Sequence, residues 1–354
     1  MSEEPYLTLR EFLDRFPLGF PQTTAGIEIK ILKRLFTEEE AKIAVLLNPI
    51  PETAAQIAKR NKMDEKILEK NLESMAKKGL IFRAGHKNKT FYNSAPFMIG
   101  LYEYSVKKID QALAKLFKEY YDIAYLDEMG ASNIPGFKVL PIEKTIQPNT
   151  VLYPFQKLER SIRESRKIAV TECICRKESR LTGEGCDYPI ETCLSFGSAA
   201  EYYIENGMGR EITADEAIEI IIEADKAGLV HAGVNSKHLS NLCNCCPCCC
   251  ASMKGITKLG HNRHKYLNAL FASIIDKEKC IGCGSCIDRC PVEAITLADI
   301  ASVDREKCLG CGLCAGVCPE EAITLAVRKD GEEPFDRVIE LGMAILEGKK
   351  SRMV

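Results

Sequence analysis

The sequence predicts an α+β protein with several domains, and three observations support this prediction. The chain has 354 residues, a length that usually divides into two or three domains. Amphipathic helical patterns dominate its first half, whereas short segments rich in β-branched residues adjoin cysteines in its second half. One cysteine-rich run then occurs twice near the C-terminus. From these patterns we expect five segments, at residues 1–97, 98–165, 166–272, 273–327 and 328–354.

Composition and charge argue against several classes of protein. Hydrophobic residues make up 46% of the chain and charged residues 28%, which is typical of a folded protein with a sizeable core. The net charge of −2 gives no global attraction to nucleic acid or anionic membranes. The N-terminus has early acids and no continuous apolar run, so we expect no secretory signal and a cytoplasmic protein. No apolar run reaches about 18 residues, so no membrane span is expected.

The N-terminal region carries the pattern of three helices followed by a hairpin. Acids open the first predicted helix, at 36–47, where the helix dipole favours them. Pro51 marks the start of a second helix, and a third spans 63–80. LIFRAG and KTFYNS then predict two strands joined by a short turn. This order resembles the winged-helix domains of bacterial and archaeal regulators, which implies a winged-helix-like domain over residues 1–97.

A winged helix can bind DNA or dock onto another protein. Residues 31–95 contain 13 Lys and Arg against 8 Asp and Glu, and the third predicted helix holds four of each sign. Contacts to phosphates would need a clear basic face, which this pattern does not supply. We therefore expect a protein-docking role and do not expect DNA as a partner.

The next segment is predicted to be mainly helical, with an irregular middle. Residues 102–126 predict one long amphipathic helix. The stretch 129–150 is rich in Gly, Pro, Asn and Ser and predicts an extended connection. A further helix, FQKLERSIRESR at 155–166, precedes the cysteine-rich part of the chain.

Residues 167–252 predict a cysteine-rich α/β segment. KIAVTECICR has the β-branched content of a strand, which would place Cys173 and Cys175 on one face. Thr213 and Glu216 fit a capping box at the start of a helix, and LVHAGV predicts another strand after that helix. Eighteen cysteines in the whole chain are many for a reducing compartment, where dense cysteine points to metal or redox chemistry.

The most specific pattern is a repeat near the C-terminus. DKEKCIGCGSCIDRCPVEAITLA at 276–298 recurs as DREKCLGCGLCAGVCPEEAITLA at 304–326, 28 residues later. Each copy contains C-x2-C-x2-C-x3-C-P, a cubane-cluster run in which the fourth cysteine serves the other cluster. Glycines between the cysteines can reach positive φ at little cost and aim backbone N–H groups at sulfur. A structural zinc site would not need two interleaved runs.

Residues 273–327 therefore resemble a bacterial-type ferredoxin domain with two [4Fe–4S] clusters. The resemblance implies that each cluster takes three cysteines from one run and the last cysteine from the other. The first cluster would take Cys280, Cys283, Cys286 and Cys318, and the second would take Cys308, Cys311, Cys314 and Cys290.

The stretch NLCNCCPCCC, residues 241–250, raises the question of a further metal site. Cys243, Cys246 and Cys249 repeat the C-x2-C-x2-C spacing without the intervening glycines. A fourth ligand could come from cysteines upstream, and ten cysteines in all would suffice for two clusters with two spare thiols. The candidate metal ligands are Cys173, Cys175, Cys186, Cys193, Cys243, Cys245, Cys246, Cys248, Cys249 and Cys250.

The chemistry of these ten cysteines stays open at this point. A structural zinc ion would use four of them and leave six unexplained, and a group of thiols without metal is a further alternative. Disulfides between adjacent cysteines are disfavoured by their geometry. The paired cysteines are similar to the CCG motifs of heterodisulfide reductases, but Pro247 and Ala251 stand where glycine is expected, so that chemistry is not carried over.

Histidines and arginines near these cysteines could serve as ligands, proton donors or charge partners. The commoner fate of each such side chain is solvation on a loop, and we expect that fate for each of them. They are His231, His238, His261, His264, Arg176 and Arg180.

These features predict an iron–sulfur electron-transfer protein of anaerobic metabolism. We expect no bound nucleotide, because G-x-G-x-x-G after a strand and the P-loop motif are both absent. The expected redox partner is therefore a flavin-, metal- or corrinoid-containing enzyme. Residues 276–326 hold nine acids and five bases, which favours a basic partner surface. The tail at 334–348 should form a helix that packs on the repeat region or on the partner.

Two other functions stay open. The cysteine-rich segment could form an oxidoreductase with its own substrate site, or the chain could be a redox-sensing winged-helix regulator. We expect a non-catalytic component instead, because no acid–base pair stands out near the cysteines and the basic footprint of the N-terminal region is weak.

Overall fold

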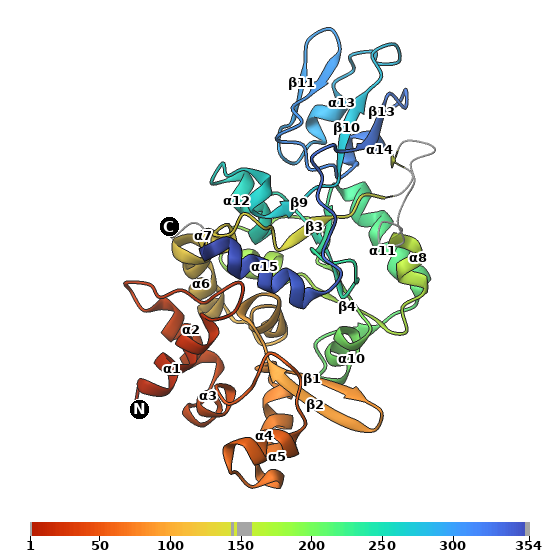
Figure 1. The fold of residues 1–354 in the computed structure, drawn as a ribbon. Coiled ribbons are helices and arrows are strands. Elements are labelled where there is room, and N and C mark those ends of the chain that lie inside the picture. The colour runs from red at the N-terminus through yellow and green to blue at the C-terminus, as the bar shows by residue number, and fades with distance from the viewer. Residues whose placement is uncertain (1, 143–144, 147–157, 351–354) are drawn as a thin grey trace.

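The computed structural model describes residues 2–142, 145–146 and 158–350, and it combines helices with β-sheets (Figure 1). A seven-stranded sheet occupies the middle of the molecule. The N-terminal helices lie at one end and the C-terminal module, residues 273–327, lies at the other. Buried side chains of the first helices continue into the central sheet as one hydrophobic cluster. No described helix has both the length and the apolar character that crossing a membrane requires.

The N-terminal region packs five helices and a hairpin. Thr37 and Thr53 each begin a helix with a capping box, in which the threonine accepts a backbone N–H and the third residue of the helix binds back. The three predicted helices are present with shorter bounds, and the predicted hairpin is present within one residue of its expected position. The first two helices were not predicted. The elements are α1 (Glu4–Leu13), α2 (Ile27–Leu35), α3 (Glu38–Ala44), α4 (Ala54–Asn61), α5 (Glu65–Lys77), β1 (Ile81–His86) and β2 (Lys89–Ser94). The assignment to the winged-helix family stays a prediction.

The long helix predicted at 102–126 is wrong. The segment divides into a 3₁₀ turn (Glu103–Ser105), α6 (Gln111–Tyr120), a π-helical turn (Tyr121–Tyr125) and α7 (Leu126–Met129). Asp110 accepts a backbone N–H at the start of α6, so a new helix begins there. Further on, the rings of Tyr121 and Tyr125 both pack against Phe97 in the core, where the helix widens.

The central sheet has the strand order β6-β4-β5-β8-β7-β3-β9. Neighbouring strands are antiparallel except β3 and β9, which run parallel. β3 is buried and lies within the predicted extended connection at 129–150, of which residues 143–144 and 147–150 are outside the described part. The strands are β3 (Phe137–Val139), β4 (Ile168–Glu172), β5 (Glu191–Phe196), β6 (Arg210–Glu211), β7 (Val230–Val234), β8 (Asn241–Cys245) and β9 (Leu267–Asn268).

The strand predicted at 167–176 ends earlier than expected. β4 stops at Glu172, after its pairing with β5 shifts register, and the carbonyl of Cys173 accepts the N–H of Lys177 at 2.9 Å. Cys173 therefore stands at the start of a helix, and Cys175 lies in the first turn of that helix rather than on a strand.

Five helices accompany the sheet. They are α8 (Leu158–Arg163), α9 (Ile174–Leu181), α10 (Ser198–Glu205), α11 (Ala214–Ala227) and α12 (Ala251–Thr257). Thr213 accepts the N–H of Glu216 at the start of α11, as predicted, but the Glu216 carboxylate binds Arg210 at 2.5 Å, so the capping box does not close through that side chain. The helix predicted at 155–166 corresponds to α8, and its residues 155–157 lie outside the described part.

The C-terminal module reflects the sequence repeat. Its elements are β10 (Phe271–Ile275), α13 (Ser285–Asp288), β11 (Ile295–Leu297), β12 (Ala301–Val303), α14 (Leu313–Gly316) and β13 (Ile323–Val327). The short helices α13 and α14 begin 28 residues apart, the offset of the repeat. β10, which precedes the first copy, pairs antiparallel with β13 of the second copy. β11 of the first copy pairs antiparallel with β12, which precedes the second copy.

The predicted C-terminal helix is present as α15 (Val338–Lys350), but its expected docking on the module is wrong. It packs instead on the N-terminal half, near α7 in Figure 1. Gly342 lies against Pro17, and Lys349 forms an ion pair with Glu128 just after the core turn of Tyr125. Two glycines of α15, Gly342 and Gly348, allow this close approach, because a Cβ atom at either position would crowd the surface opposite.

Candidate metal centres

The two cysteine runs of the module fold around two hollows. Each hollow is lined by the first three cysteines of one run and the last cysteine of the other. The first hollow has Cys280, Cys283, Cys286 and Cys318, and the second has Cys308, Cys311, Cys314 and Cys290. The antiparallel pairing of β10 with β13 brings the two runs together. Each hollow thus gathers four of the eight cysteines.

Glycines shape the turns between these cysteines. Gly282 and Gly310 are equivalent in the repeat and have positive φ angles of 69° and 64°. A Cβ atom on Gly282 would lie 2.5 Å from the carbonyl oxygen of Asp299, and one on Gly310 would collide with the carbonyl of Phe271. These positions therefore need glycine for two reasons, the backbone angle and the close approach of a second chain segment.

Backbone N–H groups point at sulfur in both halves of the repeat. The N–H of Ala294 donates to Cys290 Sγ at 3.2 Å, and the N–H of Ala322, 28 residues later, donates to Cys318 Sγ at 3.3 Å. Such hydrogen bonds stabilise the thiolate form that binds iron. Each donor lies four residues after the last cysteine of its run. That last cysteine lines the hollow of the other run, and its sulfur is the one that accepts this hydrogen bond.

The two hollows differ in exposure. Cys283 in the first hollow is exposed, and hydrogen bonds from Ser285 lower the pKa of its thiol. Cys314 in the second hollow is buried, and burial raises the pKa of its thiol to about 12 although Ser273 hydrogen bonding opposes the shift. The hydroxyl of Ser273, 3.2 Å from Cys314 Sγ, was not foreseen because it lies outside both runs. The first hollow is the one nearer the molecular surface.

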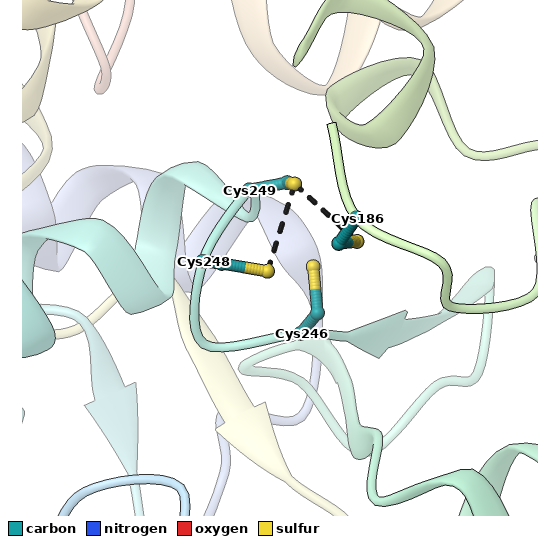
Figure 2. A group of neighbouring side chains, drawn as sticks. All are labelled: Cys186, Cys246, Cys248 and Cys249. Carbon is teal, nitrogen blue, oxygen red and sulfur yellow. Dashed lines mark hydrogen bonds between the residues drawn. The ribbon is translucent and has the colours of Figure 1, made fainter. Parts of the chain in front are cut away.

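Four cysteines of the middle segment form a compact group, the four-cysteine site. Cys186 comes from the loop after α9, and the other three come from the loop between β8 and α12 (Figure 2). The site consists of Cys186, Cys246, Cys248 and Cys249, and its four sulfurs all lie within 4.8 Å of one another. Cys249 Sγ is 3.6 Å from Cys186 Sγ and 3.7 Å from Cys248 Sγ. Hydrogen bonding from Cys249 lowers the pKa of Cys246 to about 5, outweighing burial.

The remaining six cysteines form a second group, the six-cysteine ring. Each of its thiols interacts with two others of the group, so the contacts close a loop. The order around the ring is Cys173, Cys175, Cys250, Cys245, Cys243 and Cys193. The sequence predicted that these ten cysteines could bind metal, but it did not divide them into four and six.

Pairing within the sheet and two helix starts build the ring. β5 pairs antiparallel with β8 in the register Leu194↔Leu242, which places Cys193 beside Cys243. Side chains two apart on a strand share a face, so Cys245 lies on the same side as Cys243. The other three cysteines come from the first residues of α9 and α12, where backbone N–H groups without helical partners favour thiolates.

The ring thiols alternate in acidity. Hydrogen bonds from neighbouring thiols lower the pKa of every second cysteine, although burial opposes this. The same contacts, together with burial, raise the pKa of the others. The lowered set is Cys173, Cys243 and Cys250, and the raised set is Cys175, Cys193 and Cys245. Thiolates that are buried together are stabilised by nearby positive charge.

Arg176 supplies such a charge between the two groups. It is fully buried, which overturns the expectation that it is solvated. Its guanidinium donates to the carbonyl of Asn244 at 2.9 Å and to the hydroxyl of Thr192. Burial lowers the pKa of Arg176, but the negative charge of nearby thiolates outweighs burial and raises that pKa. These thiolates are Cys173 and Cys193 of the ring and Cys246 of the four-cysteine site. Arg180 is exposed and donates to the carbonyls of Cys186 and Tyr188.

A carboxyl group that the sequence did not single out also faces the ring. Burial raises the pKa of Glu103 to about 8, and the thiols of Cys243 and Cys173 add to the shift. Its carboxylate accepts the N–H of Gly100 at 2.8 Å. Glu103 is about 70 residues from the first ring cysteine and sits in the segment predicted as a regular helix, so no local motif could have linked it to the ring.

The four nearby histidines have different fates. His231 is buried on β7, not solvated on a loop, and its Nδ1 lies 2.5 Å from Asn244 Oδ1. Burial lowers its pKa. His261 Nδ1 lies 2.8 Å from the hydroxyl of Tyr266, and burial lowers the pKa of His264. His238 is exposed, as expected. None of them joins the two cysteine groups among the described residues.

A cleft of about 790 Å³ separates the middle segment from the module. Pro247, inside the loop of the four-cysteine site, lies on one wall, and Cys290 of the second hollow lies on the other. Arg263 and Arg289 also line it, and Arg289 crosses to the middle segment by donating to the carbonyl of Lys226 at 2.8 Å. The four-cysteine site therefore lies on the side of the middle segment that faces the module.

Comparison with known proteins identifies the chemistry of the module. A family model described as a 4Fe-4S dicluster domain matches residues 273–325. Ferredoxin-2 of Desulfomicrobium norvegicum is 56% identical over 27 residues, which are 8% of this chain and 46% of that ferredoxin. The match thus spans less than half of the ferredoxin. No solved structure matches the chain. The chain carries a ferredoxin-like iron–sulfur domain of the dicluster type.

Proposed function

We propose that this chain is an iron–sulfur electron-transfer protein, a non-catalytic component that exchanges electrons with a redox partner enzyme. The crossed grouping of the eight module cysteines around two hollows supports this most directly. Those cysteines would hold two [4Fe–4S] clusters, which supply single-electron transfer when bound. The ten cysteines of residues 173–250 would hold further metal.

The residues around the first hollow suit contact with a partner. Cys283 is exposed, and Ile281 beside it is 64% exposed, so an apolar contact can form at the rim. Glu320 lines the same hollow and adds negative charge. A basic surface with a small apolar centre would complement this rim. A flavin-, metal- or corrinoid-containing enzyme in an oxygen-free cytoplasm is the partner that we propose.

The N-terminal region supports docking onto protein rather than DNA. Arg83 of the hairpin pairs with Glu73 at 2.8 Å and also with Glu205 of α10, and Lys78 pairs with Glu40 at 2.5 Å. Carboxylates thus neutralise basic groups that would otherwise meet phosphates. Nearby, Ile67 of α5 is 63% exposed and offers an apolar contact for a partner protein.

Serine variants test the crossed grouping under anaerobic conditions. Cys318→Ser should alter the same cluster signal in the EPR spectrum as Cys283→Ser, because both cysteines line the first hollow. Cys290→Ser should in turn alter the signal that Cys311→Ser alters. Each variant should lose up to about half of the module iron. If Cys318→Ser and Cys311→Ser instead affected one signal, the grouping would be wrong.

One observation favours a second candidate, an oxidoreductase with its own substrate site. The cleft beside the four-cysteine site is large enough for a small molecule, and Arg263 on its wall is 2% exposed. Its Nη2 atom has no hydrogen-bond partner among the described residues. Steady consumption of a chemical reductant by the isolated chain, dependent on an added small molecule and lost in Arg263→Gln, would support this candidate over the first.

A further inference from the structure

The ten cysteines of the middle segment divide into two groups that differ in size and shape. The four sulfurs of the four-cysteine site all lie within 4.8 Å of one another. Among the described residues, no other group of potential metal ligands is as compact. The six-cysteine ring has more members, and among the described residues its sulfurs are not gathered within such a short distance of one another. The ring therefore encloses more room than the four-cysteine site.

The four-cysteine site has the dimensions of a single tetrahedral ion. Bonds of about 2.3 Å from a central metal to four sulfurs give sulfur–sulfur separations of about 3.8 Å. The observed separations from Cys249 to Cys186 and Cys248 are 3.6 and 3.7 Å. A cubane places four irons between its thiolates, so those sulfurs would have to move apart to accept one. Zinc or a single iron fits without that movement.

The ring has the features of a polynuclear centre. Six thiols exceed what one tetrahedral ion can bind. Three of the six ring cysteines, Cys173, Cys245 and Cys250, are at most 8% exposed. Cys173 and Cys250 stand at the starts of α9 and α12, where backbone N–H groups lack helical partners.

Charge also favours a metal core in the ring. Burying several thiolates beside Glu103 costs several kcal/mol for each ion unless positive charge compensates them. Arg176 is the cation that the ring contacts, and it is shared with Cys246 of the four-cysteine site. One guanidinium cannot offset several buried thiolates, whereas a core of several iron ions can.

We propose that the six-cysteine ring holds the additional iron–sulfur cluster of this chain and that the four-cysteine site holds a single metal ion. This assignment rests on the proposed function only in taking residues 173–250 to carry iron. The cluster would use at least four of the six thiols, and any thiol left over would remain beside it as a potential donor of hydrogen bonds.

Two matched double variants test the assignment in the full-length chain purified without oxygen. Cys173→Ser/Cys243→Ser removes two thiols of the ring, and Cys186→Ser/Cys248→Ser removes two ligands of the four-cysteine site. Iron, zinc and acid-labile sulfide are measured per chain, because a cluster contains sulfide and a single tetrahedral ion does not. The two variants control for each other, since both replace two thiols by hydroxyls.

The ring variant should lose all sulfide above the roughly eight ions of the two module clusters. The four-cysteine variant should lose about one zinc or iron and no sulfide. Loss of sulfide from the four-cysteine variant, with the ring variant unchanged, would overturn the assignment. So would wild-type protein with only about eight sulfides, a result that needs no variant to fold. Failure of the proposed function is separate, because it would appear as missing EPR signals of the module in the wild type.

Discussion

Arg176 shows at the scale of one residue what the sequence could and could not predict. The spacing of the cysteines marked its neighbourhood as a metal-binding region, but nothing local indicated that its guanidinium is buried. Its partners Thr192 and Asn244 come from β5 and β8, 16 and 68 residues away. Burial that depends on such distant partners follows from the pairing of strands, which a single sequence does not specify.

Substitution of Arg176 should destabilise the chain. Arg176→Gln removes the charge that lies between the ring and Cys246, and loss of one partner from a buried ionic group costs about 3–5 kcal/mol. Arg176→Lys keeps the charge but loses the fork of donors to Asn244 and Thr192, so an intermediate loss is expected. Thermal unfolding of the anaerobic holoprotein measures both. Equal stability of Arg176→Gln and wild type would contradict the role of Arg176.

Gly310 should be intolerant of any side chain. An alanine there would adopt a positive φ and also collide with the carbonyl of Phe271. Gly260 has a similar φ of 66°, but no atom lies within 4 Å of its added Cβ, so Gly260→Ala is the matched control. The control should cost about 1–2 kcal/mol. Gly310→Ala should cost more stability than the control and should also lower the iron content of the module. Thermal melting measures the stability, and iron analysis measures the iron content. Equal losses of stability in the two variants would show that the close approach is unimportant.

At the scale of elements, the sequence predicted those with strong local signals. Acids in the first turn located α3, Pro51 located α4, and the capping pair Thr213 and Glu216 located α11. Predictions failed where distant packing decides the backbone. Residues 102–126 divide where Asp110 caps α6, and the helix widens further on where the ring of Tyr125 packs against Phe97. The short strand β3 joins the sheet through β7 and β9.

The strand β3 also contains a lysine that should make stability depend on pH. Lys138 is 2% exposed, and burial lowers its pKa from 10.5 to about 8. As pH falls from about 10.5 to about 8, the unfolded chain gains a proton that the folded chain does not bind, so stability falls; below about 8 it is constant. The total deficit at pH 7 is about 3 kcal/mol.

Lys138→Met should remove that deficit. We expect the variant to be more stable than the wild type at pH 7, by about 3 kcal/mol less about 1 kcal/mol for the lost hydrogen bond to Ser236. The advantage should disappear near pH 10. Anaerobic thermal melts at both pH values provide the measurement, and a stability difference that does not change with pH would contradict the shift. Burial also lowers the pKa of Lys108 to about 8. Lys108 is present in both proteins, so its contribution to the pH dependence cancels when their stabilities are compared.

At the scale of the whole molecule, the parts are held together by specific contacts. Arg289 of the module donates to the carbonyl of Lys226 across the cleft, and Tyr202 of α10 donates to the carbonyl of Ile81 at 2.7 Å. The hairpin is therefore packed on the middle segment rather than free. The sequence repeat predicted the module and its eight cysteines, but the division of the other ten into two groups depends on the register of β5 with β8 and could not be predicted.

We expect the whole chain to make no measurable contacts with the phosphates of duplex DNA. Two basic residues of this region, Lys78 and Arg83, are paired with carboxylates. Any residual binding should show a slope near zero in a plot of log affinity against log salt concentration. Fluorescence anisotropy with duplex DNA at several salt concentrations measures this slope. A steep negative slope would instead favour the regulator that we do not propose.

The central claim is that thiolates of this chain bind iron–sulfur clusters, with the module holding two of them. Iron and acid-labile sulfide analysis of the anaerobically purified wild-type chain, combined with EPR of the reduced protein, tests it most directly. We expect brown protein with more than about eight irons and eight sulfides per chain and signals from two module clusters. Colourless protein that contains zinc and no sulfide would contradict it.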